Sequence, residues 1–283
     1  MVKNIEALQE IAAQVRRDII RMVAQAKSGH PGGSLGCTDL VTALYFHIMD
    51  IDPAHFTKEG AGEDMFFLSN GHISPMLYSI MARRGYFEVS ELSTFRRLGT
   101  RLQGHPTPVE HLPGIRIASG SLGQGISVAI GAAIAKKHNN DPHVIYTLTG
   151  DGELEEGQIW EALMFAGAKQ VDNLIVIVDH NKKQIDGSTD DVMPLGSLKD
   201  KFTAFMWDVL EMDGNHMQNV VETLQEAKSK LGKGKPVCIV MKTEMGMGVD
   251  FMMGTHKWHG TPPNPQQAED ALSQLPITSL GDF

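Results

Sequence analysis

Three uninterrupted apolar segments in the second half of the chain restrict its fold more than any other feature. They are HVIYTLTG (143–150), NLIVIVDH (173–180) and PVCIVMKT (236–243). Strands with apolar side chains on both faces are typical of parallel sheets that helices cover on each side. The intervening segments 157–170 and 220–230 carry apolar residues at helical spacing. This alternation predicts an α/β fold with a doubly wound, mostly parallel sheet flanked by helices.

The first half of the chain predicts helices and one further strand. Residues 5–26 repeat apolar side chains at three- and four-residue steps, as an amphipathic helix does. We expect Gly29 to take the left-handed position after this helix and Pro31 to prevent its continuation. Residues 65–69 predict a strand, whereas residues 93–120 show no period. An irregular segment of that length in a compact domain favours a binding role.

Composition and charge exclude several classes of protein. The formal net charge of -9 argues against a nucleic-acid binder, because such sites need clustered Lys and Arg. Charged and apolar residues alternate over the first twenty positions, which excludes a signal peptide or membrane span there. Cys37 and Cys238 lie in apolar stretches and are expected to be buried, reduced thiols. We therefore expect a cytoplasmic protein that binds neither nucleic acid nor membrane.

Two polar turns follow neighbouring strands of the predicted sheet. Gly150-Asp151-Gly152 ends one apolar run and Asp179-His180-Asn181 ends the next. Ligands of doubly wound sheets bind beyond the carboxyl ends of the strands. Asp151 and Asn181 offer the carboxylate and amide oxygens that Mg²⁺ prefers, and the glycines let a phosphate approach the backbone. The pattern favours a diphosphate and magnesium site, although Gly-Asp-Gly alone is equally typical of a turn.

Both turns belong to longer motifs. GDGELEEGQIWEA (150–162) and DHNKKQIDG (179–187) resemble the thiamine diphosphate motif of the transketolase family. Further matches occur in the order found in that family and cover nearly the whole chain. They are KSGHPGGSLG (27–36), LSNGHISPMLYS (68–79), QGHPTP (103–108), SGSLGQGISVAIGAA (119–133) and WHG (258–260).

The resemblance implies that thiamine diphosphate and Mg²⁺ bind together, with Ca²⁺ or Mn²⁺ as possible substitutes for Mg²⁺. The metal would be held by Asp151, the amide of Asn181 and the backbone carbonyl of Lys183. Glu156 matches a glutamate at the interface between the cofactor-binding domains, whereas Glu153 and Glu155 are expected to be surface charges. The implied cofactor-binding residues are His72, Ser121, Leu122, Gly123, Gly150, Asp151, Gly152, Glu156, Asn181 and His259.

Four histidines would act on the substrate. The resemblance places His30 and His259 along the substrate channel, where they would transfer protons. It places His72 near the diphosphate and the substrate, and His105 on a hydroxyl of the transferred two-carbon unit. His256 is a second candidate in GTHKWHG, but WHG is the part that matches the family, so we favour His259. Histidine suits proton transfer because its ordinary pKa lies near neutral pH.

Single-chain transketolases continue into a pyrimidine-binding domain and a C-terminal domain, and neither follows Phe283 in this sequence. Residues 1–260 would form the domain that binds thiamine diphosphate and Mg²⁺, and residues 261–283 a C-terminal tail. The resemblance thus implies the N-terminal subunit of a split transketolase. Its expected partner is a C-terminal subunit that carries the pyrimidine-binding half, in an α2β2 assembly.

The implied reaction moves a two-carbon ketol unit from a ketose phosphate to an aldose phosphate, within the pentose phosphate pathway. Thiamine diphosphate supplies the electron sink that this carbon–carbon cleavage needs. Three alternatives stay open: half of a deoxyxylulose-phosphate synthase-like enzyme, a 2-oxo-acid dehydrogenase α subunit, and a non-catalytic scaffold subunit. The histidines in SGHPGG and QGHP favour transketolase.

Overall fold

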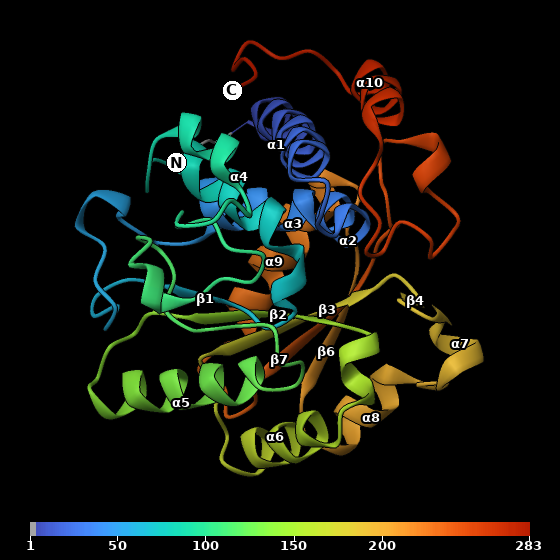
Figure 1. Ribbon diagram of the computed structural model, residues 1–283. Coiled ribbons are helices and arrows are strands. Elements are labelled where there is room, and N and C mark those ends of the chain that lie inside the picture. The colour runs from blue at the N-terminus through green and yellow to red at the C-terminus, as the bar shows by residue number, and fades with distance from the viewer. Residues whose placement is uncertain (1–3) are drawn as a thin grey trace.

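A five-stranded sheet lies at the centre of the computed structural model, which describes residues 4–283 (Figure 1). Its strands lie in the order β1-β2-β3-β7-β6, and every neighbouring pair is parallel. The predicted doubly wound α/β fold is confirmed. The strands are β1 (Met65–Leu68), β2 (Ile145–Gly150), β3 (Leu174–His180), β6 (Asp208–Asp213) and β7 (Val237–Lys242).

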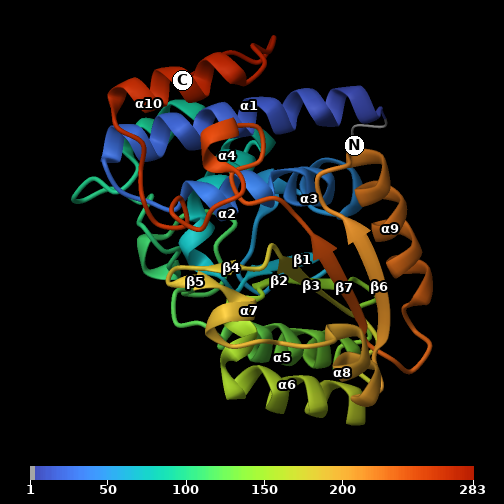
Figure 2. The same ribbon diagram turned by 90° about the vertical axis from the view of Figure 1, so that its right-hand side faces the viewer.

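Helices cover both faces of this sheet (Figures 1 and 2). One layer contains α5 (Gly125–His138), α6 (Gly157–Ala168) and α8 (Leu198–Ala204). The other contains α1 (Ile5–Ala26), α3 (Thr38–Ala43), α4 (Ser74–Arg84) and α9 (Met217–Lys230). Alternate residues of β3 pack into the two layers, since Ile175 and Ile177 join the core beneath α1 while Val176 and Val178 join the core beneath α6. Burial on both faces explains why this strand is apolar at almost every position.

The end of α1 differs from the expectation. The helix covers the predicted residues, but the left-handed residue that follows it is Lys27, with φ of 50°, and not Gly29. Pro31 also does more than prevent continuation, because it begins α2 (Pro31–Gly36). Proline suits the first turn of a helix, where the missing N–H would have no partner within the helix.

The sequence pattern does not reveal strand β6. It is an edge strand with mostly half-exposed or exposed residues, and Asp208, Glu211 and Asp213 interrupt its apolar character. A small hairpin and a short helix between β3 and α8 also lack a clear pattern. These elements are β4 (Lys183–Gln184), β5 (Gly187–Ser188) and α7 (Thr189–Val192).

The segment 261–283, expected as a tail, contains helix α10 (Pro265–Gln274) and packs against α1 (Figure 2). Arg17 on α1 donates hydrogen bonds to Asp282, at 2.7 Å, and to the backbone oxygen of Leu272, at 3.0 Å. The Arg21 guanidinium lies 5.1 Å from the centre of the Phe283 ring. Charged and aromatic contacts therefore hold this segment along the first helix.

Cys37 and Cys238 are buried and form no disulfide, as expected. Among residues 4–283, no helix combines the length and apolar character that crossing a bilayer requires.

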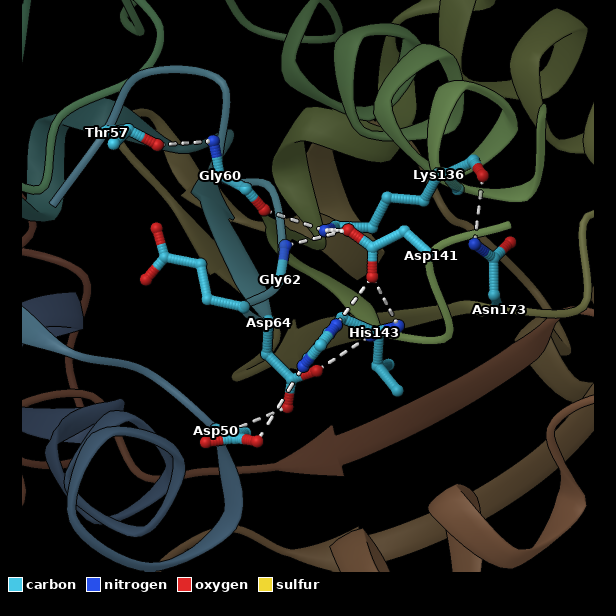
Figure 3. Close-up of polar contacts among 12 residues, drawn as sticks. Asp50, Thr57, Gly60, Gly62, Asp64, Lys136, Asp141, His143 and Asn173 are labelled. Carbon is cyan, nitrogen blue, oxygen red and sulfur yellow. Dashed lines mark hydrogen bonds and ion pairs between the residues drawn. The ribbon is translucent and has the colours of Figure 1, made fainter. Parts of the chain in front are cut away.

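A network of polar contacts lies at the amino ends of β1 and β2 (Figure 3). The buried Lys136 of α5 donates to Asp141, at 2.6 Å, and to the carbonyl oxygen of Gly60, at 2.8 Å. The same carboxylate accepts the backbone N–H groups of Gly62 and His143, each at 3.0 Å. Burial by itself raises the pKa of Asp141, but the hydrogen bonds from Lys136, Gly62 and His143 outweigh burial and hold this pKa well below its ordinary value. The network ties the loop before β1 to the connection between α5 and β2.

Asp141→Asn should destabilise the protein by roughly 1.5–3 kcal/mol at pH 7, the usual range for losing a hydrogen bond to a charged group. The Lys136 ammonium would stay buried without its counter-charge. Because folding lowers the pKa of Asp141, its stabilising effect is complete above the unfolded pKa of about 3.9 and is lost as the pH falls toward the folded value. Urea unfolding at several pH values tests this prediction.

Glu211→Gln serves as the control, since its partner Lys242 is 67% exposed and such surface pairs contribute about 0–1 kcal/mol. The difference between wild type and Asp141→Asn should narrow as the pH falls from about 5 toward 3. A difference that stays constant over that interval would contradict the assignment.

Candidate active site

A cavity of about 330 Å³ opens at the carboxyl ends of β2 and β3. This is the edge of the sheet at which doubly wound folds bind their ligands. The turn after β2, the turn after β3 and the loop before α5 form its walls. Most of the predicted site residues line it: His30, His72, Leu122, Gly150, Asp151, Gly152, Glu156, Asn181, Lys183 and His259.

Three predicted residues lie outside this lining. The His105 ring lies behind His30, with 6.4 Å between the ring centres. Ser121 is exposed at the rim. Gly123 is buried behind the wall with φ of 83°, a left-handed conformation that glycine adopts without strain. The structure therefore brings the predicted residues into one region, but these three do not border the cavity itself.

The two polar turns meet through hydrogen bonds to the backbone. The Asp151 carboxylate accepts the N–H of Lys182 at 2.5 Å and that of Gly152 at 2.8 Å. The Asn181 side-chain oxygen accepts the N–H of Lys183 at 2.9 Å, while its amide nitrogen donates to Asp179 at 2.8 Å. These contacts bring Asp151, Asn181 and Lys183 together although 29 positions of sequence separate the first two.

The electrostatics of these turns fit a bound cation. Burial raises the pKa of Asp151 to about 8, and the nearby charge of Asp179 adds to this rise. The two lysines of the second turn form ion pairs with other carboxylates and not with Asp151 or Asp179. Lys182 pairs with Asp190 at 3.3 Å, and Lys183 pairs with Glu244 at 3.5 Å. Among residues 4–283, the buried carboxylates of Asp151 and Asp179 thus lie together without an ion pair to a cationic side chain. A hard divalent cation with oxygen ligands, such as Mg²⁺, would neutralise them.

Three histidines, His30, His72 and His259, cluster on the opposite wall, and His105 lies behind His30. The ring centre of His72 lies 5.0 Å from those of His30 and His259, and His30 lies 5.7 Å from His259. Burial lowers the pKa of His30 to about 4, and the neighbouring His259 and Arg96 add to the decrease. Burial likewise lowers the pKa of His72, His105 and His259. All four imidazoles are therefore neutral at neutral pH and are able to accept or relay a proton.

Several buried polar atoms of this wall have no partner within residues 4–283. They include Nδ1 of His30, Nδ1 of His259 and the side-chain oxygen of Asn70. Buried polar atoms in folded proteins nearly always have a hydrogen-bond partner. These atoms are therefore available to a ligand, and Asn70 is a site residue that the sequence analysis overlooks.

Comparison with known proteins decides the family. Residues 7–278 match the family model described as transketolase, thiamine diphosphate binding domain. The chain belongs to the transketolase family. It is 39% identical over 272 residues to one of the subunits of the apulose-4-phosphate transketolase from Phocaeicola vulgatus, a match that covers 96% of this chain and 95% of that one. It is 40% identical over 268 residues to a 6-deoxy-6-sulfo-D-fructose transketolase subunit of a Clostridium strain, covering 95% and 96%.

Solved transketolases share the fold but are longer. The crystal structure of transketolase from Campylobacter jejuni superposes with a TM-score of 0.88 at 33% identity, covering 98% of this chain and 44% of that chain. Human transketolase is 32% identical over 281 residues, which are 96% of this chain and 42% of the human protein. The chain therefore corresponds to the N-terminal domain of single-chain transketolases and to nearly the full length of the subunit relatives.

One expectation about this transketolase domain is wrong. The sequence predicts Glu153 as a surface charge, but this residue is 2% exposed and lies beside the cavity. Glu155 is half-buried and also lines the cavity. Both carboxylates follow Asp151 in a short turn that folds back over the strand ends, and charge pattern alone does not reveal this turn. The structure also places His259, and not His256, against the His72 ring.

Proposed function

We propose that this chain is the diphosphate-binding subunit of a two-chain transketolase. In this proposal the complete enzyme transfers a two-carbon ketol unit from a ketose phosphate to an aldose phosphate. The main support is one cavity with two chemically different walls: a turn rich in oxygen ligands that carries Asp151 and Asn181, and a cluster of neutral histidines. The relatives that match over almost their whole length are named as transketolase subunits.

The oxygen-rich wall would hold the cofactor. Asp151, the Asn181 amide oxygen and the Lys183 carbonyl would bind Mg²⁺, for which Ca²⁺ or Mn²⁺ could substitute. Gly152 and His72 would contact the diphosphate. Thiamine diphosphate, when bound, supplies the electron sink for the carbanion that carbon–carbon cleavage leaves behind.

The histidine wall would handle protons. Cleavage of the ketose requires a base for the hydroxyl next to the breaking bond, and joining to the acceptor requires the proton to return. Burial lowers the pKa of His30 and His259, and each has a buried ring nitrogen without a partner in the described part of the chain, so they are suited to this transfer. His105 would hold a hydroxyl of the two-carbon unit from behind His30.

We propose sugar phosphates of the pentose phosphate pathway as substrates. The relatives are named for other sugars, apulose 4-phosphate and 6-deoxy-6-sulfo-D-fructose. A panel of donors assayed with the reconstituted enzyme decides between them: xylulose 5-phosphate, fructose 6-phosphate, apulose 4-phosphate and the sulfonated ketose. Preference for either of the last two by more than tenfold in kcat/KM would contradict the pathway assignment.

Two further parts of the proposal concern the assembly and its location. We propose an α2β2 complex with a C-terminal subunit that carries the pyrimidine-binding half, and a cytoplasmic location. Light scattering on the co-expressed subunits gives the stoichiometry, and a mass that corresponds to one copy of each subunit would contradict α2β2. Cell fractionation tests the location, and recovery of the protein outside the cytoplasmic fraction would contradict it.

His105→Ala should impair use of the donor ketose while leaving cofactor affinity within about twofold of wild type. Losing one hydrogen bond to substrate costs roughly 1–3 kcal/mol, which corresponds to about a 5- to 150-fold decrease in kcat/KM for the donor. Steady-state kinetics of the reconstituted enzyme and calorimetric titration of thiamine diphosphate measure the two effects. The matched control is His138→Ala, an exposed histidine at the end of α5. Loss of cofactor affinity with unchanged donor kinetics would assign His105 to the cofactor instead.

A further inference from the structure

Glu153 connects three segments that meet around the cavity. One of its carboxylate oxygens accepts the Ser69 hydroxyl at 2.5 Å and the Gly123 N–H at 2.8 Å. The other accepts the Gly150 N–H at 3.1 Å. Ser69 directly follows β1, Gly150 ends β2, and Gly123 belongs to the loop before α5. A single buried side chain therefore bonds to the ends of two strands and to a separate loop.

The loop that Glu153 contacts forms one wall of the cavity. Gly120 and Leu122 border the cavity, whereas Gly123 is buried behind them. The loop also lies very close to the end of β1, because a Cβ at Gly125 would lie 2.5 Å from the Ser69 hydroxyl oxygen. A Cβ at Gly71 would similarly overlap the hydroxyl oxygen of Ser119. Glycine at these two positions permits the close packing, and the carboxylate supplies the polar connection.

The proposed function uses this wall, since Ser121, Leu122 and Gly123 are among the implied cofactor-binding residues. We propose that Glu153 is a positioning residue that sets the affinity for thiamine diphosphate by fixing the loop 119–124 against the ends of β1 and β2. The inference rests on the proposed function for the identity of the ligand. The attachment of the loop rests only on the three hydrogen bonds.

The chemistry of the three donors makes the carboxylate difficult to replace. The backbone N–H groups of Gly123 and Gly150 can only donate, and they face different oxygens of Glu153. Glutamine has the same shape but one of its two terminal atoms is an NH₂ group. In Glu153→Gln this NH₂ must face one of the two N–H groups, and that N–H loses its acceptor in a buried position. The variant therefore keeps the packing while it breaks one connection.

Hydrogen exchange measures the attachment without any ligand. In Glu153→Gln, the amide of Gly123 and the segment 119–125 should exchange at least about tenfold faster than in wild type, because an opening that costs less exchanges more often. Exchange in the centre of β3 should not change. Calorimetric titration of the subunit complex with thiamine diphosphate and Mg²⁺ should then show about a 10- to 100-fold weaker Kd.

Ser69→Ala removes a single hydroxyl and leaves both backbone connections in place, so the protein should fold. Its cofactor Kd should increase less than that of Glu153→Gln. The double variant should weaken cofactor binding by less than the sum of the two single effects, since both changes remove hydrogen bonds of the same carboxylate. Glu161→Gln, on the exposed surface of α6, removes an equal charge and should leave the Kd and the exchange rates unchanged.

The outcomes separate the possible roles of Glu153. Faster loop exchange with unchanged Kd, or a lower melting temperature alone, would show a purely structural role and overturn the proposal. Weaker binding with unchanged loop exchange and additive effects of Ser69→Ala would show direct contact with the ligand and overturn it as well. If the wild-type complex does not bind thiamine diphosphate, the proposed function fails together with this inference. In every other failure the proposed function survives.

Discussion

Asp151→Ala should abolish metal-dependent binding of thiamine diphosphate and with it the activity of the reconstituted enzyme. Removing partners outside the metal's own ligands already costs about 10- to 100-fold in affinity or activity, so losing a ligand should cost more than about 100-fold. Asp151 is the only carboxylate in the proposed set of ligands, which otherwise consists of neutral oxygens. Calorimetric titration with Mg²⁺ and thiamine diphosphate measures the loss directly.

Asp151→Asn separates charge from shape in this experiment. It should stay folded, because it keeps the shape of the side chain and burial already raises the pKa of Asp151 to about 8, so this carboxyl is largely uncharged at neutral pH without a cation. It should nevertheless bind the cofactor poorly, because an amide cannot supply the negative charge that the cation would bind. Asp186→Ala, an exposed residue between β4 and β5, should bind normally. Unchanged cofactor affinity in both Asp151 variants would remove the metal assignment.

The purified chain alone should show less than about 1% of the transketolase activity of the complex with its C-terminal partner. In the proposed function the C-terminal partner carries the pyrimidine-binding half of the cofactor site, so this chain alone would hold only the diphosphate half. The helix layer that contains α5 and α6 is consistent with such a partner, because four large apolar side chains are exposed on these two helices. They are Val128 (44%), Ile134 (39%), Met164 (54%) and Phe165 (45%). Exposed apolar groups that form a contiguous patch mark interaction surfaces.

Turnover of xylulose 5-phosphate and ribose 5-phosphate, with and without the partner, provides the assay. Met164→Glu should weaken association of the two subunits at least tenfold, because a charge would be buried in the interface. The control is Ile277→Glu, which changes an equally apolar residue that is 89% exposed and lies outside α5 and α6. Full turnover by the chain alone would contradict the two-chain assignment and leave the apolar surface unexplained.

The sequence predicts those elements whose pattern of buried and exposed positions is regular. The strand at 174–180 is buried on both faces, so it is apolar throughout, and α1 is buried on one face, so it follows the helical period. Strand β6 lies at the edge, where its acids face solvent and hide the pattern. Local backbone detail is harder, as the left-handed Lys27 illustrates. Tertiary packing selects such conformations against the preference of the residue.

The residues of the candidate site also differ in how well the sequence predicts them. Asp151 and Asn181 follow predicted strands, and the direction of parallel strands then places them at one edge of the sheet. Glu153 lies only two residues further along, but its role depends on Ser69 and Gly123, which are distant in sequence. No local sequence pattern indicates that a carboxylate will accept hydrogen bonds from three different segments. The resemblance to transketolases also leaves its environment open, and only the structure reveals it.

The polar network around Lys136 and the candidate active site lie at opposite ends of the same strands. Strand β2 covers six residues between them, a length of about 20 Å. Substitutions that far apart, with no shared partner, generally have additive effects on stability. Protein engineers who wish to reshape the candidate active site could therefore first stabilise the distant network. A more stable parent would tolerate the losses that new substrate contacts usually bring.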